Sequence, residues 1–269
     1  KGKMKIIVCV KQVPDTSGKV AVNPDGTLDR ASMQTITNPD DLNAVEAALA
    51  LKDETGCKVV VVTMGPPPAE GMLREILARG ADEAVLVSGR EFGGSDTYAT
   101  SQILAAAINR IGVEPEDIIM CGRQAIDGDT AQVGPQIAEK LGLPQVTYAA
   151  DIHKDGDCIT VKRMLEDGYM TIRVKTPCLV TCIKELNEPR YMSIGGVFEC
   201  YDKPMAVFDY EALKDDPLID PTTIGLKGSP TNILTSFTPP QKGAGMMLPG
   251  AEKADCEKLA GMLAAKHII

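Results

Sequence analysis

The fold and the candidate site of this chain are both indicated by residues 122–134, which read Gly122-Arg123-Gln124-Ala125-Ile126-Asp127-Gly128-Asp129-Thr130-Ala131-Gln132-Val133-Gly134. This segment follows a short apolar run at residues 117–121 that predicts a buried strand, and it leads into a predicted helix. It supplies one cation, small residues and hydroxyl or amide donors. Amides at a helix N-terminus bind phosphate, and Arg123 would neutralise a diphosphate. The segment favours a phosphate-binding turn, with an ordinary strand-to-helix loop as the alternative.

On either side of this turn, short apolar runs alternate with amphipathic stretches over residues 4–150. That alternation is typical of βα units that build a mostly parallel sheet flanked by helices, which is an α/β fold. The expected strands are rich in Val and Ile and are closed by Gly, Pro or polar residues. They are residues 5–13, 58–64, 83–88, 117–121 and 145–149.

Helices are expected between these strands. Asn38 is expected to cap the first helix with its side chain, and Pro39 suits the first helical position. A second helix is expected to end near Gly80. The segment Ser95-Asp96-Thr97 opens a third, because an acid or hydroxyl accepts hydrogen bonds from the first exposed amides.

The start of the fourth helix has two interpretations. Asp129 and Gln132 have the spacing of a capping box, which would begin the helix after Asp129. Pro135 would then lie inside the helix and remove a hydrogen bond. A start nearer Gly134 is the alternative.

The chain changes character after residue 150. Turn signals at residues 154–157 and 166–168 separate β-rich segments, which predicts antiparallel strands added to the sheet. Beyond Asn187 the periodicity fades, and many prolines and glycines indicate an extended C-terminal arm. A final helix is expected at about residues 251–266. We expect a nucleotide-binding domain at residues 1–186 and a partner-binding arm at residues 187–269, whose apolar side chains a second chain covers.

Composition narrows the function classes. The 28 basic and 37 acidic residues give a net charge of -9, which repels nucleic acid and anionic lipid. No apolar run approaches the roughly 20 residues that a membrane span needs, so we expect no membrane insertion and a cytoplasmic location. The eight cysteines form no CxxC pair and the chain has two histidines, which favours buried reduced thiols over a metal site.

Ligands of open parallel sheets bind beyond the carboxyl ends of the strands, and three further loops are expected there, at residues 9–15, 64–66 and 88–97. Gly93-Gly94-Ser95-Asp96-Thr97 is similar to the pyrophosphate loop of ATP pyrophosphatases, although that motif belongs after the first strand. A capped turn explains it equally well. His153 and His267 show no pairing with a nucleophile. No catalytic residue is therefore expected, and any redox chemistry would belong to a cofactor.

Four ordered segments together resemble the β subunit of an electron-transfer flavoprotein: Val8-Cys9-Val10-Lys11-Gln12-Val13-Pro14-Asp15, Asn38-Pro39, residues 122–134, and Leu186-Asn187-Glu188-Pro189-Arg190-Tyr191. The resemblance extends over essentially the whole chain. It implies a fold related to adenine-nucleotide α-hydrolases, a heterodimer with an electron-transfer flavoprotein α subunit, and no turnover without that partner. It also implies that Cys9, Asn38 and Met64 surround adenine and ribose, and that residues 122–133 hold the phosphates.

The family divides by the nucleotide in this site, which is AMP in the housekeeping type and a second FAD in the electron-bifurcating type. Residues 92–101 and 127–135 resemble the bifurcating type, and Gly128 and Ala131 leave room for a larger ligand. The resemblance implies hydride transfer from NADH to FAD. One electron then passes to ferredoxin or flavodoxin, and the other passes through the α-subunit FAD to an acyl-CoA dehydrogenase-type flavoenzyme. The AMP-binding type is the alternative, and an ATP pyrophosphatase-like enzyme is a remote one.

The residues expected at the two binding sites come from the loops named above. Those expected around the nucleotide are Cys9, Val10, Asn38, Met64, Arg90, Phe92, Gly94, Ser95, Asp96, Thr97, Gly122, Arg123, Gln124, Ala125, Asp127, Gly128, Asp129, Thr130, Ala131, Gln132 and Val133. By resemblance, those that dock on the dehydrogenase are Leu186, Asn187, Glu188, Pro189, Arg190 and Tyr191.

Overall fold

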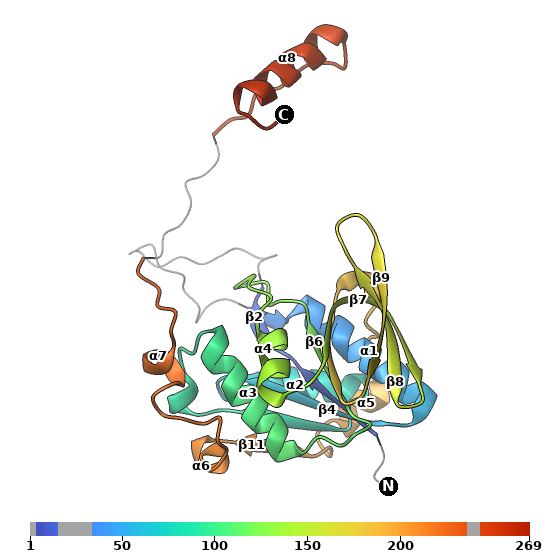
Figure 1. Cartoon of the computed structure of the whole chain (residues 1–269), viewed down its shortest axis with the longest axis vertical. Helices are drawn as coiled ribbons and strands as arrows, with labels where there is room; N and C mark the ends of the chain where they lie inside the picture. The colour runs from blue at the N-terminus through green and yellow to red at the C-terminus, as the bar shows by residue number, and fades with distance from the viewer. Residues whose placement is uncertain (1–3, 16–33, 236–242) are drawn as a thin grey trace.

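The computed structural model describes residues 4–15, 34–235 and 243–269, and within these ranges a nine-stranded sheet organises the chain (Figure 1). The strand order is β11-β5-β4-β1-β6-β10-β7-β8-β9. Neighbours from β11 to β7 pair in parallel, whereas β7, β8 and β9 pair antiparallel. The strands are β1 Lys5–Cys9, β4 Lys58–Met64, β5 Glu83–Val87, β6 Ile118–Gly122, β7 Gln145–Asp155, β8 Cys158–Met164, β9 Tyr169–Lys175, β10 Cys178–Cys182 and β11 Met205–Phe208. The predicted α/β class, with antiparallel additions to a mostly parallel sheet, is confirmed.

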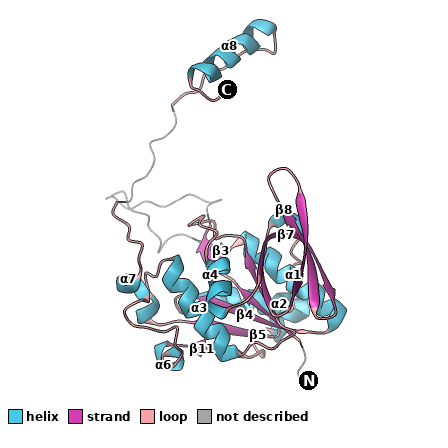
Figure 2. Ribbon diagram, in the orientation of Figure 1, coloured by secondary structure: helices cyan, strands magenta, loops and turns pink. Residues whose placement is uncertain are grey.

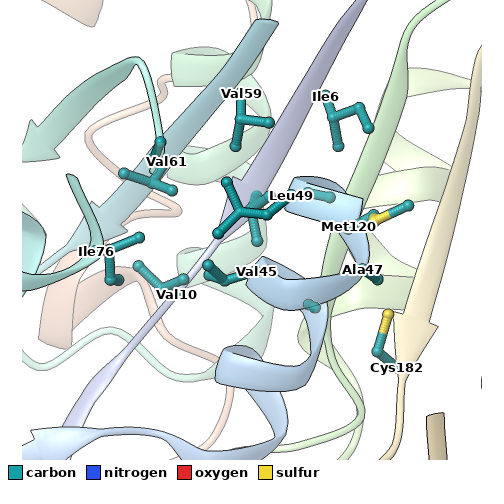
Figure 3. Close-up of a cluster of buried hydrophobic side chains, with 14 of the residues drawn as sticks. Ile6, Val10, Val45, Ala47, Leu49, Val59, Val61, Ile76, Met120 and Cys182 are labelled. Carbon is teal, nitrogen blue, oxygen red and sulfur yellow. The ribbon is translucent and has the colours of Figure 1, made fainter. Parts of the chain in front are cut away.

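Helices pack on both faces of the parallel sheet because successive buried residues of a strand point to opposite faces. On one face, Ile6 of β1 and Met120 of β6 share a buried cluster with Val45 and Leu49 of the first helix (Figure 3). On the other face, Ile7 packs in a cluster with the third and fourth helices. The helices are α1 Pro39–Thr55, α2 Ala69–Arg79, α3 Thr97–Ile111, α4 Val133–Leu141, α5 Ile194–Glu199, α6 Tyr210–Leu213, α7 Gly225–Gly228 and α8 Lys253–Ala265, with 3₁₀ turns η1 Arg90–Phe92 and η2 Lys184–Leu186.

The first expected strand, residues 5–13, is two strands instead of one. β1 ends at Cys9, and β2 Gln12–Pro14 pairs antiparallel with β3 Thr35–Thr37 in a separate small sheet. The chain turns between them, where the N–H of Lys11 donates to a carboxylate oxygen of Asp41 at 2.8 Å. An apolar run alone does not show such a turn, because the partner that fixes it lies 30 residues away.

The predicted starts of α1 and α3 are confirmed, and so is the predicted side-chain cap of α3. Asp96 caps α3 by accepting a hydrogen bond from the N–H of Ala99. Pro39 occupies the first turn of α1, but Asn38 makes no side-chain cap. α4 begins at Val133, so the later start is correct and the capping box of Asp129 and Gln132 is wrong. Pro135 then lies in the first helical turn, where no amide is needed.

The antiparallel additions form the predicted hairpins, and β7, expected to end at residue 149, continues to residue 155 (Figure 2). β7 changes partner along its length, from parallel β10 to antiparallel β8. The backbone of Tyr148 is left-handed there, with φ of 59°. This local kink lets one strand join the parallel sheet to the hairpins.

The C-terminal arm contributes to the main sheet. β11 pairs with β5 at the sheet edge, and Leu213, Ile219 and Ile224 enter the core cluster that contains α3. By contrast, no described residue of α8 is buried. Ile233 and Leu234 are exposed, and Phe237 lies outside the described residues. Among the described residues, none of the helices has both the length and the apolar character needed to span a bilayer.

Candidate functional site

The carboxyl edge of the parallel sheet holds a cavity of about 640 Å³. The cavity lies where β1 pairs with β6. The chain goes from β1 to β4 and β5 on one side of β1 and then crosses to β6 on the other side, so the strand order reverses at this point. Open α/β sheets bind ligands at such a reversal of strand order, because the loops on the two sides diverge. The lining residues are Cys9, Val10, Lys11, Asp41, Met64, Ser95, Asp96, Thr97, Thr100, Leu104, Cys121, Gly122, Arg123, Gln124, Ala125, Gly128, Asp129, Thr130, Ala131, Gln132, Val133, Gly134, Ile137, Thr231 and Ile233.

A buried carboxylate joins the ends of β1 and β6. Asp41, in the first turn of α1, accepts hydrogen bonds from the N–H groups of Lys11 and Gly122, each at 2.8 Å. Burial raises the pKa of Asp41 to about 7, although both hydrogen bonds act in the opposite direction. A Cβ on Gly122 would lie 2.5 Å from Asp41 Oδ1, so glycine is required for this approach. Asp41 thereby fixes where both loops begin.

Asn38 fastens the loop after β6 to the start of α1. Its Nδ2 donates to the carbonyl of Gln124 at 2.8 Å, and its Oδ1 accepts from the N–H of Ile126 at 3.1 Å. These bonds use both polar atoms of the side chain, which explains why the predicted helix cap is absent. Asn38 is fully buried and does not line the cavity.

The middle of the loop after β6 is held in an unusual backbone conformation. Asp129 and Ala131 have φ of 52° and 51°, a region that residues with a Cβ adopt infrequently. Asp129 Oδ1 accepts a hydrogen bond from Gln124 Nε2 at 2.8 Å, and Gln132 Oε1 accepts one from Thr97 Oγ1 at 2.9 Å. Among the described residues, the backbone N–H groups of residues 130–134 have no acceptor. They are therefore available to an anion at the start of α4.

Each of two cations that line the cavity has an acidic partner. Lys11 Nζ lies 2.8 Å from both carboxylate oxygens of Asp127. Arg123 Nε lies 3.3 Å from Asp40 Oδ2. Burial raises the pKa of Asp40, and the positive charge of Arg123 opposes that rise. Both ion pairs connect the loop after β6 to segments on the other side of the strand reversal.

The C-terminal arm packs on the loop after β5. Asp96 Oδ2 accepts a hydrogen bond from the N–H of Thr231 at 2.9 Å, and the N–H of Asp96 donates to Ser229 Oγ at 2.8 Å. Burial tends to raise the pKa of Asp96, but hydrogen bonds from Ala99 and Thr231 together lower it below its ordinary value. Ser95 Oγ is also in contact with the arm, accepting from the N–H of Gly225 at 3.0 Å. The arm therefore completes this wall of the cavity.

Two thiols line the bottom of the cavity. Cys9 and Cys121 are register partners on β1 and β6. Burial, with the negative charge of Asp41, raises the pKa of Cys9 to about 12, and burial raises that of Cys121. Both thiols are thus protonated at neutral pH and serve as apolar walls instead of nucleophiles.

The model of the electron transfer flavoprotein domain matches residues 25–205, which is more than half of the chain. This chain belongs to the electron transfer flavoprotein family. The match includes the loop after β6 that forms one wall of the cavity.

Relatives agree with this assignment over almost their whole length. The acryloyl-CoA reductase electron transfer subunit gamma of Anaerotignum propionicum is 70% identical over 99% of this chain and 100% of its own. Subunit CarD of the caffeyl-CoA reductase-Etf complex of Acetobacterium woodii is 51% identical over the same shares. The electron transfer flavoprotein subunit beta of Clostridium acetobutylicum is 49% identical over the same shares. This chain is accordingly a β-type subunit of an electron transfer complex.

Most residues of this chain that were expected around the nucleotide do line the cavity. Five of them do not: Asn38, Arg90, Phe92, Gly94 and Asp127. Phe92 is buried in the core cluster beside α3, and Arg90 is exposed on η1. Gly94 has φ of 73°, and a Cβ there would lie 2.8 Å from Leu226 Cβ. In this loop Phe92 packs against the core and Gly94 against the arm, so neither faces the cavity. Asp127 is held at the rim by Lys11.

The cavity also has lining residues that were not expected from the sequence. Thr100 and Leu104 follow Thr97 at helical spacing, and Ile137 follows Val133, so the period of α3 and α4 could have indicated them. Thr231 and Ile233 carry no such signal because they come from the arm. Asp41 and Cys121 were not expected either, whereas Lys11 and Gly134 lie in loops expected at the site but were not named as contacts.

The segment expected to dock on a partner flavoenzyme is attached to α1 by hydrogen bonds and ion pairs. Asn43 Nδ2 donates to the carbonyl of Asn187 at 2.8 Å, and Arg190 forms ion pairs with Glu46 and Asp53, each at 2.9 Å. Leu186 is partly buried against the core, whereas Tyr191 is 92% exposed. The role of Leu186, Asn187, Glu188, Pro189, Arg190 and Tyr191 in docking stays a prediction.

Proposed function

We propose that this chain is the β subunit of an electron-bifurcating electron transfer flavoprotein that holds FAD in the cavity between β1 and β6. The observation that carries the proposal is the row of amides at residues 130–134, for which the described part of the chain offers no acceptor, and which line the same cofactor-sized cavity as Arg123. The names of two close relatives attach them to CoA-thioester reductases. That supports an acyl-CoA dehydrogenase-type flavoenzyme as the partner of this chain.

The residues of the site fit a dinucleotide. The amides of residues 130–134 and the guanidinium of Arg123 would bind the diphosphate, which carries negative charge. A Cβ on Gly128 would meet no atom within 4 Å, so the protein leaves space beside this part of the loop. The thiols of Cys9 and Cys121 would form an apolar floor. Among the described residues, no aromatic side chain lines the cavity, so the isoalloxazine ring would rest on backbone, aliphatic groups or the α subunit.

When bound, FAD supplies the chemistry of accepting a hydride from NADH and releasing two electrons by separate routes, one to ferredoxin or flavodoxin and one through the α-subunit FAD to the dehydrogenase. The residues of this chain bind and orient the cofactor. The neutral thiols of Cys9 and Cys121 would exclude water from the floor of the site, which strengthens electrostatic contacts made beside it. None of these residues needs to exchange protons with substrate.

The direct experiment is to purify the chain with its α subunit, release the nucleotides by denaturation, and count FAD and AMP per heterodimer. We expect two FAD. One FAD with one AMP would contradict bifurcation and support the housekeeping type.

The position of the second nucleotide is tested by Gly128→Leu, with Gly128→Ala as the matched control. The leucine would take up space beside the loop, so we expect loss of one FAD per heterodimer, while the alanine variant keeps both. Thermal unfolding should be similar for the two variants. Retention of both FAD molecules in Gly128→Leu would argue against this cavity as the site.

A further inference from the structure

Arg123 and Asp40 form an ion pair in the wall of the cavity, and Lys184 and Glu185 also act electrostatically on Asp40. Arg123 Nε lies 3.3 Å from Asp40 Oδ2. Both atoms are buried, and neither has a hydrogen-bond partner within the part of the chain that the structure describes. The side chain of Asp40 is only 11% exposed, whereas that of Arg123 is 38% exposed and lines the cavity. The carboxylate is thus the interior member of the pair.

The backbone on both sides of this pair is fixed. Gly122 packs so closely on the start of α1 that a Cβ would lie 2.6 Å from the carbonyl carbon of Asp40. The N–H of Arg123 donates to the carbonyl of Cys182 on β10 at 2.8 Å. Arg123 therefore leaves the sheet in a defined direction, and its guanidinium meets Asp40 at a defined place.

The chemistry of arginine gives this contact a consequence. A guanidinium is planar and has five N–H donors, one on Nε and four on the two terminal nitrogens. In the described residues, the terminal nitrogens of Arg123 have no acceptor, although its side chain lines the cavity. The carboxylate lies at ion-pair distance from the Nε edge without a hydrogen bond, and its attraction favours orientations of the guanidinium that turn this edge toward α1. The terminal edge then stays free for bidentate contact with phosphate oxygens.

We propose that Asp40 is a positioning residue, which orients the guanidinium of Arg123 toward the diphosphate of the bound nucleotide. This inference rests on the proposed function, because it needs a nucleotide in the cavity. Asp40 does not touch the ligand in this arrangement. It makes Arg123 a preorganised phosphate ligand instead of a mobile surface cation.

A simpler role for Asp40 makes a different prediction. Asp40 lies in the first turn of α1, where an acid also stabilises the helix by its interaction with the helix dipole. That role would affect stability alone. It would not distinguish a ligand with a diphosphate from one without phosphate.

The test uses the full chain in complex with its α subunit, stripped of the nucleotide in this cavity, and titrates ADP and adenosine by calorimetry. In Asp40→Asn, which keeps the shape of the side chain, we expect ADP to bind about tenfold more weakly. Adenosine should change by less than about twofold, because it has no phosphate to contact Arg123. The melting temperature is measured alongside.

A double-mutant cycle isolates the pair. Arg123→Gln should weaken ADP binding, and adding Asp40→Asn to it should cause no further loss. Arg123→Lys keeps the charge but not the fork, so it should lose ADP affinity almost as far as Arg123→Gln. The lysine variant leaves Asp40 in place and keeps the test valid even if Asp40→Asn does not assemble.

Three outcomes would overturn the inference. Equal weakening of ADP and adenosine in Asp40→Asn would leave only the helix role, and additive losses in the cycle would show that Asp40 acts independently of Arg123. Wild-type affinity in Arg123→Lys would show that the orientation of the guanidinium is unimportant. Failure of the wild-type complex to bind either ADP or FAD would instead refute the proposed function, and this inference with it.

Discussion

The loops after β6 and β5 both line the cavity, and each is held by one carboxylate that accepts two backbone N–H groups. Asp41 accepts from Lys11 and Gly122, whereas Asp96 accepts from Ala99 and Thr231. Asp41 is fully enclosed and its pKa is raised to about 7, while Asp96 is partly exposed and its pKa is lowered. The same hydrogen-bonding pattern therefore has opposite electrostatic consequences, because burial decides which effect is larger.

The two walls also differ in where their partners come from. Asp41 joins elements of the central sheet, so the loop after β6 is shaped by the core. Asp96 joins α3 to the C-terminal arm, so the loop after β5 depends on residues more than 130 positions away. We expect the first wall to be rigid and the second to be sensitive to changes in the arm.

The largest effect is expected from Gly122→Ala, which tests the rigidity of the first wall. The new Cβ would lie 2.5 Å from Asp41 Oδ1 and 2.6 Å from backbone atoms of α1. The α1 backbone cannot move aside, and the Asp41 carboxylate is held by two backbone N–H groups, so we expect a loss of about 3 kcal/mol in the free energy of unfolding. Urea denaturation measures it.

The matched control is Gly128→Ala in the same loop. A Cβ there meets nothing within 4 Å, so the free energy of unfolding should change by less than about 0.5 kcal/mol. Similar losses in the two variants would show that the close approach of α1 to Gly122 does not constrain this wall.

A smaller effect on the free energy of unfolding is expected from a change of pH, and this effect differs between Asp41 and Asp96. Folding raises the pKa of Asp41 from 3.8 to about 7. The stabilising contribution of this group is therefore complete below the pKa of the unfolded chain and is lost as the pH rises through the pKa of the folded chain. Compared with Asp41→Asn, the wild type should lose about 2 kcal/mol between about pH 5.5 and about pH 7.

Asp96 should behave in the opposite way. Its pKa is lowered, so its contribution is present above the unfolded value and is lost only as the pH falls through the lower folded value. The difference between wild type and Asp96→Asn should therefore be constant from about pH 5.5 to about pH 7. Parallel curves for Asp41→Asn and Asp96→Asn would contradict the contrast between the two walls.

The smallest effect is expected from the ion pair between Lys11 and Asp127. Both side chains are substantially exposed, so their coupling in a cycle of Lys11→Met and Asp127→Asn should be below about 1 kcal/mol and should decrease with added salt. Chemical denaturation at low and high salt measures it. A coupling above about 2 kcal/mol would mean that this surface contact, and not only Asp41, secures the first wall.

Much of the fold was predictable because it depends on local patterns. β4 was expected with the bounds that it has, and the turns at residues 154–157 and 166–168 marked the hairpins. The loop from Gly122 to Val133 was identified from its small residues and its place between a strand and a helix. Every one of its expected contact residues except Asp127 lines the cavity.

The errors share a physical cause, which is a partner distant in sequence. Asn38 has the right residue type for a helix cap, but its side chain is used by Gln124 and Ile126. Asp41 could be interpreted as a helix-dipole acid, and the sequence gives no sign that α1 meets the end of β6. β11 was not expected, because its four residues become a strand only by pairing with β5.

β11 has a consequence for the segment that precedes it. The stretch from Leu186 to Tyr201 leaves the interior strand β10 and returns to the sheet at the edge strand β11, so both of its ends are tethered. Between them, Tyr191, Ile194 and Phe198 are held outward on a short loop and helix. Residues held in this way lose little conformational entropy when another protein binds to them. Preorganisation of this kind favours recognition by shape.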